Sequence, residues 1–165
     1  MQRFWLDANV FIEANRKYYA FDLAPGFWNL LEQQCDAHVI KSPYEVFLEL
    51  ADSGDELTEW AKARRDAGNL FVEPDEHVQA AFSEIADFVT ETYSEAAAAY
   101  FLDGADPWVI GHAKCDSGTV VTMEKLAGPG SGTAKIPNVC REFSVEYIDT
   151  FGMLRELGVS FVLQK

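Results

Sequence analysis

The sequence predicts an α/β fold in three layers, with a central, mainly parallel sheet between two layers of helices. Short apolar segments, such as residues 4–6 and 119–122, have the length and composition of buried strands. Longer segments repeat apolar residues at helical spacing, as residues 78–89 do. Strands that alternate with helices along a chain form parallel sheets covered on both faces.

The amino-terminal half supplies three of the predicted strands. Residues 4–6 form the first strand, which ends on Asp7. A second is expected at residues 38–40 and a third at residues 70–72, each with apolar residues of strand length. Helices between them are expected at residues 10–14, 27–31, 43–50 and 55–61.

The start of the helix at residues 43–50 has a capping signature. Ser42 is predicted to be its N-cap and Pro43 its first residue. Glu45 follows Ser42 by three positions, as in a capping box. We expect Gly54 to end this helix.

The carboxyl-terminal half continues the alternation. Strands are expected at residues 119–122 and 145–148, and residues 159–163 form a closing strand or a tail. Helices are expected at residues 75–89, 96–99, 106–110, 136–143 and 151–157. Since there is no linker or repeat, residues 1–165 are predicted to be a single domain.

Composition limits the classes of function. No signal peptide or apolar run of membrane-spanning length is present, which predicts a cytoplasmic protein without a membrane segment. Three scattered cysteines predict reduced thiols. The net charge of −14 disfavours a broad nucleic-acid-binding face, but it allows contact through metal ions or a basic protein partner. Candidate local phosphate contacts are Lys41, Arg64, Arg65 and Lys114.

Three acids are predicted to meet at one edge of the sheet. Asp7 and Glu124 each follow a predicted strand, and Asp106 opens a helix. Ligand sites of parallel sheets form beyond the carboxyl ends of the strands. Helix N-capping is the alternative interpretation of both Asp7 and Asp106.

Further polar residues are candidates for the same site. Glu45 and Glu49 lie four apart on one helix face, where they repel unless one is solvated or neutralised. The apolar neighbours of Glu49 predict that it is the more buried of the two. Asn9 is expected either to orient Asp7 or to cap a turn, and Thr122 to bind a carboxylate or a metal-bound water.

Three other kinds of site are disfavoured by the residues present. The glycine-rich segment at residues 128–132 lacks the Gly-Lys-Ser/Thr ending of a phosphate-binding P-loop. Asp7-Ala8-Asn9 lacks the second aspartate that a haloacid-dehalogenase-like phosphatase needs. His112 and Cys115 have a metal-like spacing, but no second ligand pair follows them.

The order of these residues resembles the PIN-domain family, which includes the VapC-like toxin ribonucleases. The resemblance runs from residue 4 to about residue 163 and places the chain near an uncharacterised PIN-like branch. The family motifs match Asp7-Ala8-Asn9, Glu49-Leu50, Asp106 with Ile110 and Ala113, and Val121-Thr122-Met123-Glu124. Two departures are Ala8, where the family usually has Thr or Ser, and Glu124, where Asp is commoner.

The resemblance implies an Mg²⁺- or Mn²⁺-dependent endoribonuclease that hydrolyses RNA. Carboxylates in one crevice need a counter-charge, which an oxygen-seeking divalent ion supplies. The implied metal ligands are Asp7, Glu49, Asp106 and Glu124, with Thr122 and Asn9 as further site residues. The implied biological role is the toxin of a toxin–antitoxin pair, with a protein antitoxin and a homodimer. Two alternatives are a non-catalytic PIN-like interaction module and a nuclease acting on DNA.

Overall fold

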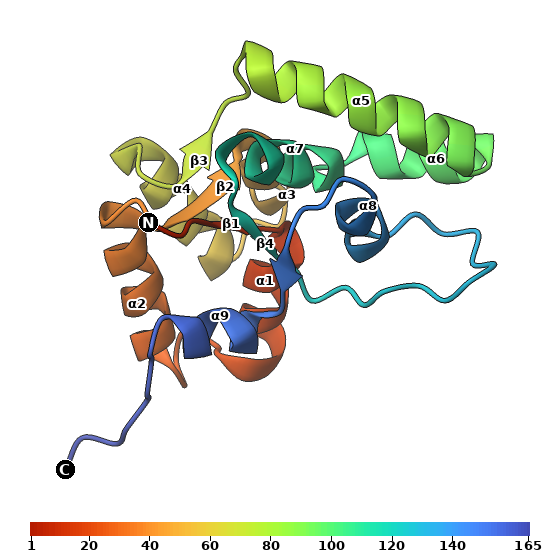
Figure 1. Cartoon of the computed structure of the whole chain (residues 1–165). Coiled ribbons are helices and arrows are strands. Elements are labelled where there is room, and N and C mark those ends of the chain that lie inside the picture. Colours follow the sequence, from red (N-terminus) through yellow and green to blue (C-terminus); the bar gives the residue numbers. More distant parts are fainter.

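Five parallel strands form the centre of the protein in the computed structural model, which describes residues 1–165 (Figure 1). Their spatial order is β3-β2-β1-β4-β5. The strands are β1 (Phe4–Leu6), β2 (Ile40–Pro43), β3 (Phe71–Val72), β4 (Thr119–Val121) and β5 (Tyr147–Ile148). The order of strands reverses at β1, between β2 and β4, and in such sheets the reversal marks the usual ligand crevice.

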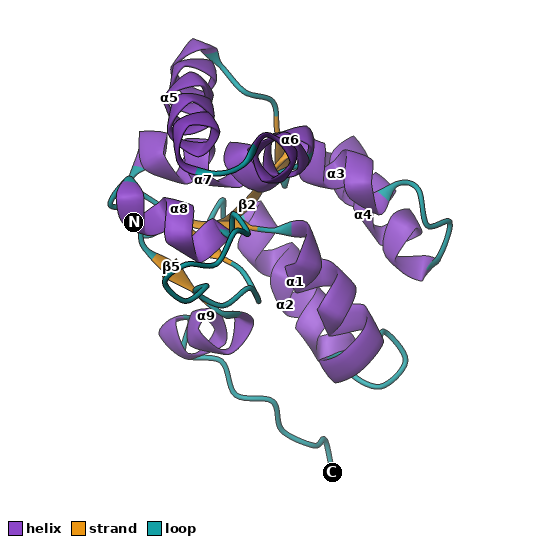
Figure 2. Cartoon of the chain, turned by 90° about the vertical axis from the view of Figure 1, so that its right-hand side faces the viewer, coloured by secondary structure: helices purple, strands orange, loops and turns teal.

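Helices cover both faces of this sheet. The first half contributes α1 (Ala8–Glu13), a π-helix η1 (Ala14–Tyr18), α2 (Pro25–Asp36), α3 (Tyr44–Leu50) and α4 (Glu56–Ala67). The second half contributes α5 (Glu76–Thr92), α6 (Glu95–Asp103), α7 (Asp106–Asp116), α8 (Ile136–Glu142) and α9 (Thr150–Glu156). Figures 1 and 2 show α5, α6 and α7 on one side of the sheet and α1, α2 and α9 on the other. The predicted three-layer α/β/α fold is therefore confirmed, with every strand pair parallel.

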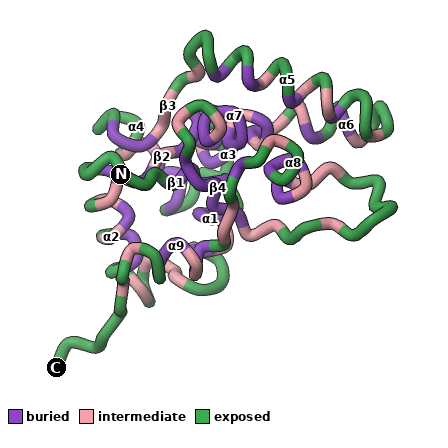
Figure 3. The backbone as a smooth tube through the Cα atoms, in the orientation of Figure 1, coloured by how far each residue is buried: buried purple, intermediate pink, exposed green.

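One hydrophobic cluster of 35 buried residues joins these layers. Every residue of β1 and β4 is buried, because helices pack on both faces of the central strands. Figure 3 shows the same pattern, with the outer turns of α5 and the carboxyl-terminal tail exposed. This packing explains why the central strands read as continuous apolar runs in the sequence.

The predicted capping box at Ser42 is wrong. β2 extends through Ser42 and Pro43, and α3 begins at Tyr44. The Ser42 hydroxyl is buried and donates to the carbonyl oxygen of Leu6 at 2.8 Å, so it joins β2 to β1 instead of capping a helix. The helix also ends at Leu50, before the predicted stop at Gly54.

The ends of several other elements follow local rules. The carboxylates of Asp55 and Asp75 cap α4 and α5 by accepting the N–H groups of Thr58 and Val78 at 3.0 and 2.9 Å. Residues 159–163 were predicted to be either a closing strand or a tail, and they form a tail without strand structure. No helix is both long and apolar enough to cross a membrane.

Candidate active site

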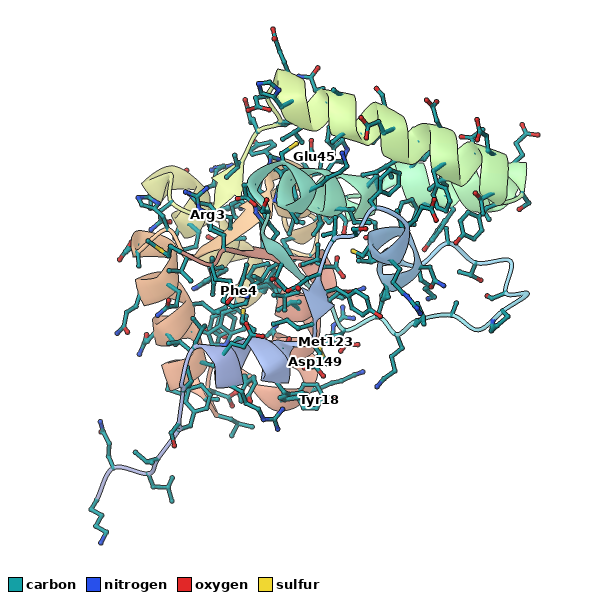
Figure 4. All side chains as sticks on the ribbon, in the orientation of Figure 1. Arg3, Phe4, Tyr18, Glu45, Met123 and Asp149 are labelled. Carbon is teal, nitrogen blue, oxygen red and sulfur yellow. The ribbon has the colours of Figure 1, made fainter.

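The candidate site lies beyond the carboxyl ends of β1 and β4, where the strand order reverses. Asp7 follows β1 directly, and its backbone N–H donates to the carbonyl oxygen of Val121 at 3.0 Å. Thr122 follows β4, and its hydroxyl donates to Oδ2 of Asp7 at 3.1 Å. Figure 4 places Met123 and Asp149, which follow β4 and β5, at the same edge. Parallel pairing thus brings together residues 115 positions apart.

Asp7 is a buried acid without a basic partner. The residue is 2% exposed, and although it occupies the N-cap position of α1, its side chain forms no capping hydrogen bond to that helix. Burial, together with the nearby charges of Glu124 and Glu49, raises the pKa of Asp7 to about 7, while the Thr122 hydrogen bond acts in the opposite direction. A carboxyl group in this position is stabilised by protonation or by a cation.

Asp106 has a similar environment on the neighbouring helix. It is the first residue of α7, whose N-cap is Ala105, and no side-chain cap bond is present. The N-cap interpretation of Asp106 is therefore wrong. Burial is the largest cause that raises the pKa of Asp106 to about 8, and the charges of Asp7, Glu124 and Glu49 contribute to the same rise. The charge of Lys135 acts in the opposite direction.

Glu49 belongs to this group of acids although it is exposed. Its Oε1 accepts the backbone N–H of Ala105 at 2.9 Å, which ties α3 to the start of α7. A Cβ at Gly104 would lie 3.3 Å from the same oxygen, so the glycine leaves room for this contact. The prediction that Glu49 is more buried than Glu45 is wrong, because Glu45 is half-buried and Glu49 is exposed.

Glu124 is connected to Asp7 through Thr122. The backbone N–H of Glu124 donates to the Thr122 hydroxyl at 3.1 Å. Oε2 of Glu124 accepts the backbone N–H of Ile136 at 2.8 Å, at the start of α8. Thr122 therefore donates to one acid and accepts from the backbone of another, which fixes the direction of its hydroxyl.

Asn9 is not brought to these acids by a hydrogen bond. It is an exposed residue of α1, and its side chain makes no hydrogen bond to Asp7. Thr122 holds the carboxylate of Asp7 instead.

Three of the four candidate phosphate-binding bases have other contacts. Lys114 pairs with Glu84 and Arg65 with Asp66, while Lys41 lies 3.3 Å from a ring nitrogen of His38. Arg64 belongs to α4. The only base whose charge acts on Asp106 is Lys135.

The weak zinc signal at His112 has a structural explanation. His112 is buried and stacks on Trp5 with ring centroids 4.4 Å apart, whereas Cys115 is exposed. Burial lowers the pKa of His112 to about 4.

Sequence analysis missed three groups that hold or balance the acids. Two are the backbone N–H groups of Ala105 and Ile136, which carry no signal in a sequence because every residue except proline has such a donor. The third, Lys135, directly precedes α8, and only the chain path brings it back to Asp106.

The donor chemistry of the site fits a hard divalent ion. All four candidate ligands are carboxylates, and Mg²⁺ is commonly held by one or two carboxylates with water and substrate oxygens. No three acidic, histidine or cysteine side chains are close enough to enclose an ion by themselves. An ion at Asp7 and Asp106 would relieve the repulsion that raises their pKa values. It would leave coordination positions open to water and phosphate.

A family model described as a domain of unknown function, DUF4411, matches residues 4–161. The chain belongs to the DUF4411 family. The family match spans every strand and the candidate acids, from β1 to the end of α9. No curated protein matches the sequence.

Two solved structures share the fold of this DUF4411 chain. One is VapBC2 from Rickettsia felis bound to a promoter DNA fragment, with 15% identity and a TM-score of 0.51. The other is DNA-bound VapBC from Salmonella typhimurium, with 17% identity and a TM-score of 0.50. Each alignment covers 90% of this chain and 98% of the other. The DUF4411 chain therefore has the PIN-like, VapC-type fold that its motifs predicted.

Proposed function

We propose that this protein is a metal-dependent ribonuclease that hydrolyses phosphodiester bonds of RNA. The observation that carries the proposal is a pair of aspartates, the buried Asp7 and the half-buried Asp106, at the reversal point of a parallel sheet. Neither carboxylate has an ion pair with a lysine or arginine, and each raises the energetic cost of ionising the other. Such a pair is suited to a divalent ion.

In this mechanism Asp7 and Asp106 hold Mg²⁺ or Mn²⁺, with Glu49 and Glu124 as the adjacent acids. A bound ion supplies an activated water and neutralises charge on the phosphate. Thr122 keeps the carboxylate of Asp7 oriented by its 3.1 Å hydrogen bond. Asp7 and Asp106 must both lose their protons before they can bind the ion, so ion binding strengthens as the pH rises through their pKa values.

The biological role we propose is that of a toxin with a protein antitoxin. The two similar structures are VapBC complexes, which share the fold at low sequence identity. The net charge of −14 suits a basic antitoxin segment by electrostatic complementarity. A homodimer is part of the same proposal, by resemblance to the PIN-domain family.

A non-catalytic interaction module is the second candidate. It is favoured by the hydrogen bonds that already use Oε1 of Glu49 and Oε2 of Glu124, and by the absence of a closed three-ligand set. In that case the acids would stabilise the start of α7 and α8 and would bind no ion. A nuclease acting on DNA is tested by the same assay with a different substrate.

Purified protein should be incubated with single-stranded RNA in Mn²⁺, in parallel with an Asp7→Asn variant and a matched DNA strand. We expect wild-type protein to cut RNA, and chelation or Asp7→Asn to abolish cutting. Equal cutting by both proteins would show that the activity is foreign to this site. Absence of both cutting and metal binding would favour the interaction module, and preferential cutting of the DNA strand would identify a deoxyribonuclease.

A further inference from the structure

A second cavity lies beside the candidate active site. It has a volume of about 610 Å³, within the range of pockets that hold small ligands. Its walls come from the α5–α6 turn, the glycine-rich segment at residues 126–132, and α8. Tyr93, Asn138 and Arg141 are among the residues that line this cavity, which we call the Arg141 pocket.

The Arg141 pocket adjoins a hollow that contains Glu124, one of the candidate acids. Leu126 lines the pocket and also lines this smaller hollow of about 280 Å³, whose wall includes Thr122 and Glu124. The hydrogen bond from the Ile136 N–H to Glu124 fixes the start of α8 against the site, and Arg141 lies in the last turn of that helix. The pocket and Glu124 are therefore linked through Leu126 and through the start of α8.

Three features of the Arg141 pocket suit a nucleotide. The guanidinium of Arg141 is exposed and forms no ion pair, so it is available to a phosphate. Tyr93 also lines the pocket, and its aromatic ring is a surface that a base can stack on. Gly128, Gly130 and Gly132 have open space around their Cα atoms, so a ligand can approach the backbone closely.

The loop that carries these glycines is anchored at its base. The Asn138 side chain accepts the N–H of Ala127 at 2.9 Å and donates to its carbonyl oxygen at 3.1 Å. The pocket therefore has one firm wall on α8 and one open wall of glycine backbone. This arrangement combines a fixed cation with a sequence-tolerant surface, as sites for single-stranded nucleic acid do.

We infer that the Arg141 pocket binds a nucleotide of single-stranded RNA that flanks the bond being cut. This inference rests on the proposed ribonuclease function and adds a subsite remote from the metal. RNA is favoured over a protein segment because the pocket presents an unpaired guanidinium and an aromatic ring, with Glu142 as the one acid among its lining residues. A peptide partner is the alternative outcome of the test.

The test measures binding and cleavage separately. Binding of a fluorescein-labelled oligouridylate about ten nucleotides long is followed by anisotropy in Mg²⁺, in the Asp7→Asn background, so that cleavage does not interfere. Arg141→Ala is compared with Arg141→Lys and with Arg3→Ala. Arg3 is a matched control because it precedes β1 and so lies at the opposite edge of the sheet (Figure 4).

We expect Arg141→Ala to weaken oligouridylate binding about tenfold, because a phosphate contact and its support for stacking are lost. For Arg141→Ala, the slope of log binding affinity against log salt concentration should become shallower by about 0.7, which a merely structural change does not produce. Arg141→Lys should restore the slope, and Arg3→Ala should match the parent.

Equal affinity and slope for Arg141→Ala and Arg3→Ala would overturn the inference and leave the pocket to a peptide partner. If the RNA binds in an Arg141-dependent manner but wild-type protein does not cut it, the subsite stands and the proposed ribonuclease function fails. If the protein cuts RNA but Arg141→Ala changes nothing, the function stands and the subsite fails. Absence of RNA binding by all variants would contradict both.

Discussion

The acids at the two edges of the central sheet have different partners, although β1 and α7 reach both edges. β1 begins beside Arg3 and ends at Asp7, while α7 begins at Asp106 and ends at Asp116. At the amino edge, Asp116 accepts the indole N–H of Trp5 at 2.9 Å and pairs with Arg3 at 3.4 Å. This acid is satisfied by the protein itself.

At the carboxyl edge, the acids have hydrogen-bond donors, such as the Thr122 hydroxyl for Asp7, but no ion pair with a base. Asp7 and Asp106 have no ion pair, and their pKa values are raised by burial and by neighbouring acids. An acid kept for stability is given a donor or a base, as Asp116 is. The lack of a basic partner for Asp7 and Asp106 supports the proposal that a divalent ion completes the site.

The largest effect expected from this comparison is on catalysis. Asp106→Asn should lower the rate of RNA cleavage at least about 100-fold, since it removes a proposed metal ligand. Asp116→Asn, at the other end of the same helix, should leave the rate unchanged. Cleavage rates are measured on protein whose folding has been checked by circular dichroism. An equal loss of rate in Asp106→Asn and Asp116→Asn would contradict the proposed difference between the two edges.

A smaller loss is expected from the residue that orients Asp7. Thr122→Val keeps the shape of the side chain but removes the hydroxyl that donates to Asp7 and accepts from Glu124. Groups that orient a metal ligand typically contribute about 10- to 100-fold. We expect a loss of that size in Mn²⁺ affinity and cleavage, with Thr122→Ser restoring most of it. Unchanged affinity in the valine variant would show that the hydroxyl does not position the site.

The pH dependence of stability should separate the edges in metal-free protein. The folded pKa values of Asp7 and Asp106, about 7 and 8, lie above the ordinary value of 3.8. The folded state therefore binds more protons than the unfolded state between these limits, so stability falls as the pH rises through this window. His112, with its lowered pKa, acts in the opposite direction only below about pH 6.5.

Thermal unfolding in a chelator, measured from about pH 6.5 to 8.5, tests this expectation. The melting temperature of wild-type protein should decrease as the pH rises, and Mn²⁺ should reverse the decrease. Asp7→Asn should flatten the dependence, because it removes one titrating acid and its charge on Asp106. A melting temperature that rises with pH in chelated wild-type protein would contradict the electrostatic description of the site.

The smallest effect concerns the satisfied acid. Asp116→Asn should cost about 1 kcal/mol in the free energy of unfolding, because its ion pair with Arg3 is partly exposed and asparagine can still accept from Trp5. Urea unfolding measures this loss. A much larger loss in the free energy of unfolding would mean that Asp116 contributes more to stability than its contacts indicate.

The sequence predicted the layers and the site edge because both depend on local patterns. Apolar runs identify strands that are buried on both faces, and an acid that directly follows such a strand must lie at its carboxyl edge. This reasoning located Asp7 and Thr122 correctly relative to β1 and β4. It also identified Asp106 at the start of α7.

Tertiary contacts decided what local patterns could not. The Ser42 motif matched a capping box, yet its hydroxyl bonds to Leu6 across the sheet. Asn9 was predicted to orient Asp7 or to cap a turn. The hydroxyl of Thr122, 115 residues away in the sequence, makes the hydrogen bond to Asp7 instead. The relative burial of Glu45 and Glu49 depends on how α3 packs, which the residues beside them in sequence do not determine.

Calorimetric titration with Mn²⁺ tests the central claim most directly. Wild-type protein and Asp116→Asn should bind Mn²⁺ with the same affinity, more tightly at pH 8 than at pH 6 because Asp7 and Asp106 must be deprotonated. Asp7→Asn should bind at least about tenfold more weakly. Equal binding by wild-type protein and Asp7→Asn, or no binding by either, would contradict the claim that the carboxyl edge holds a divalent ion.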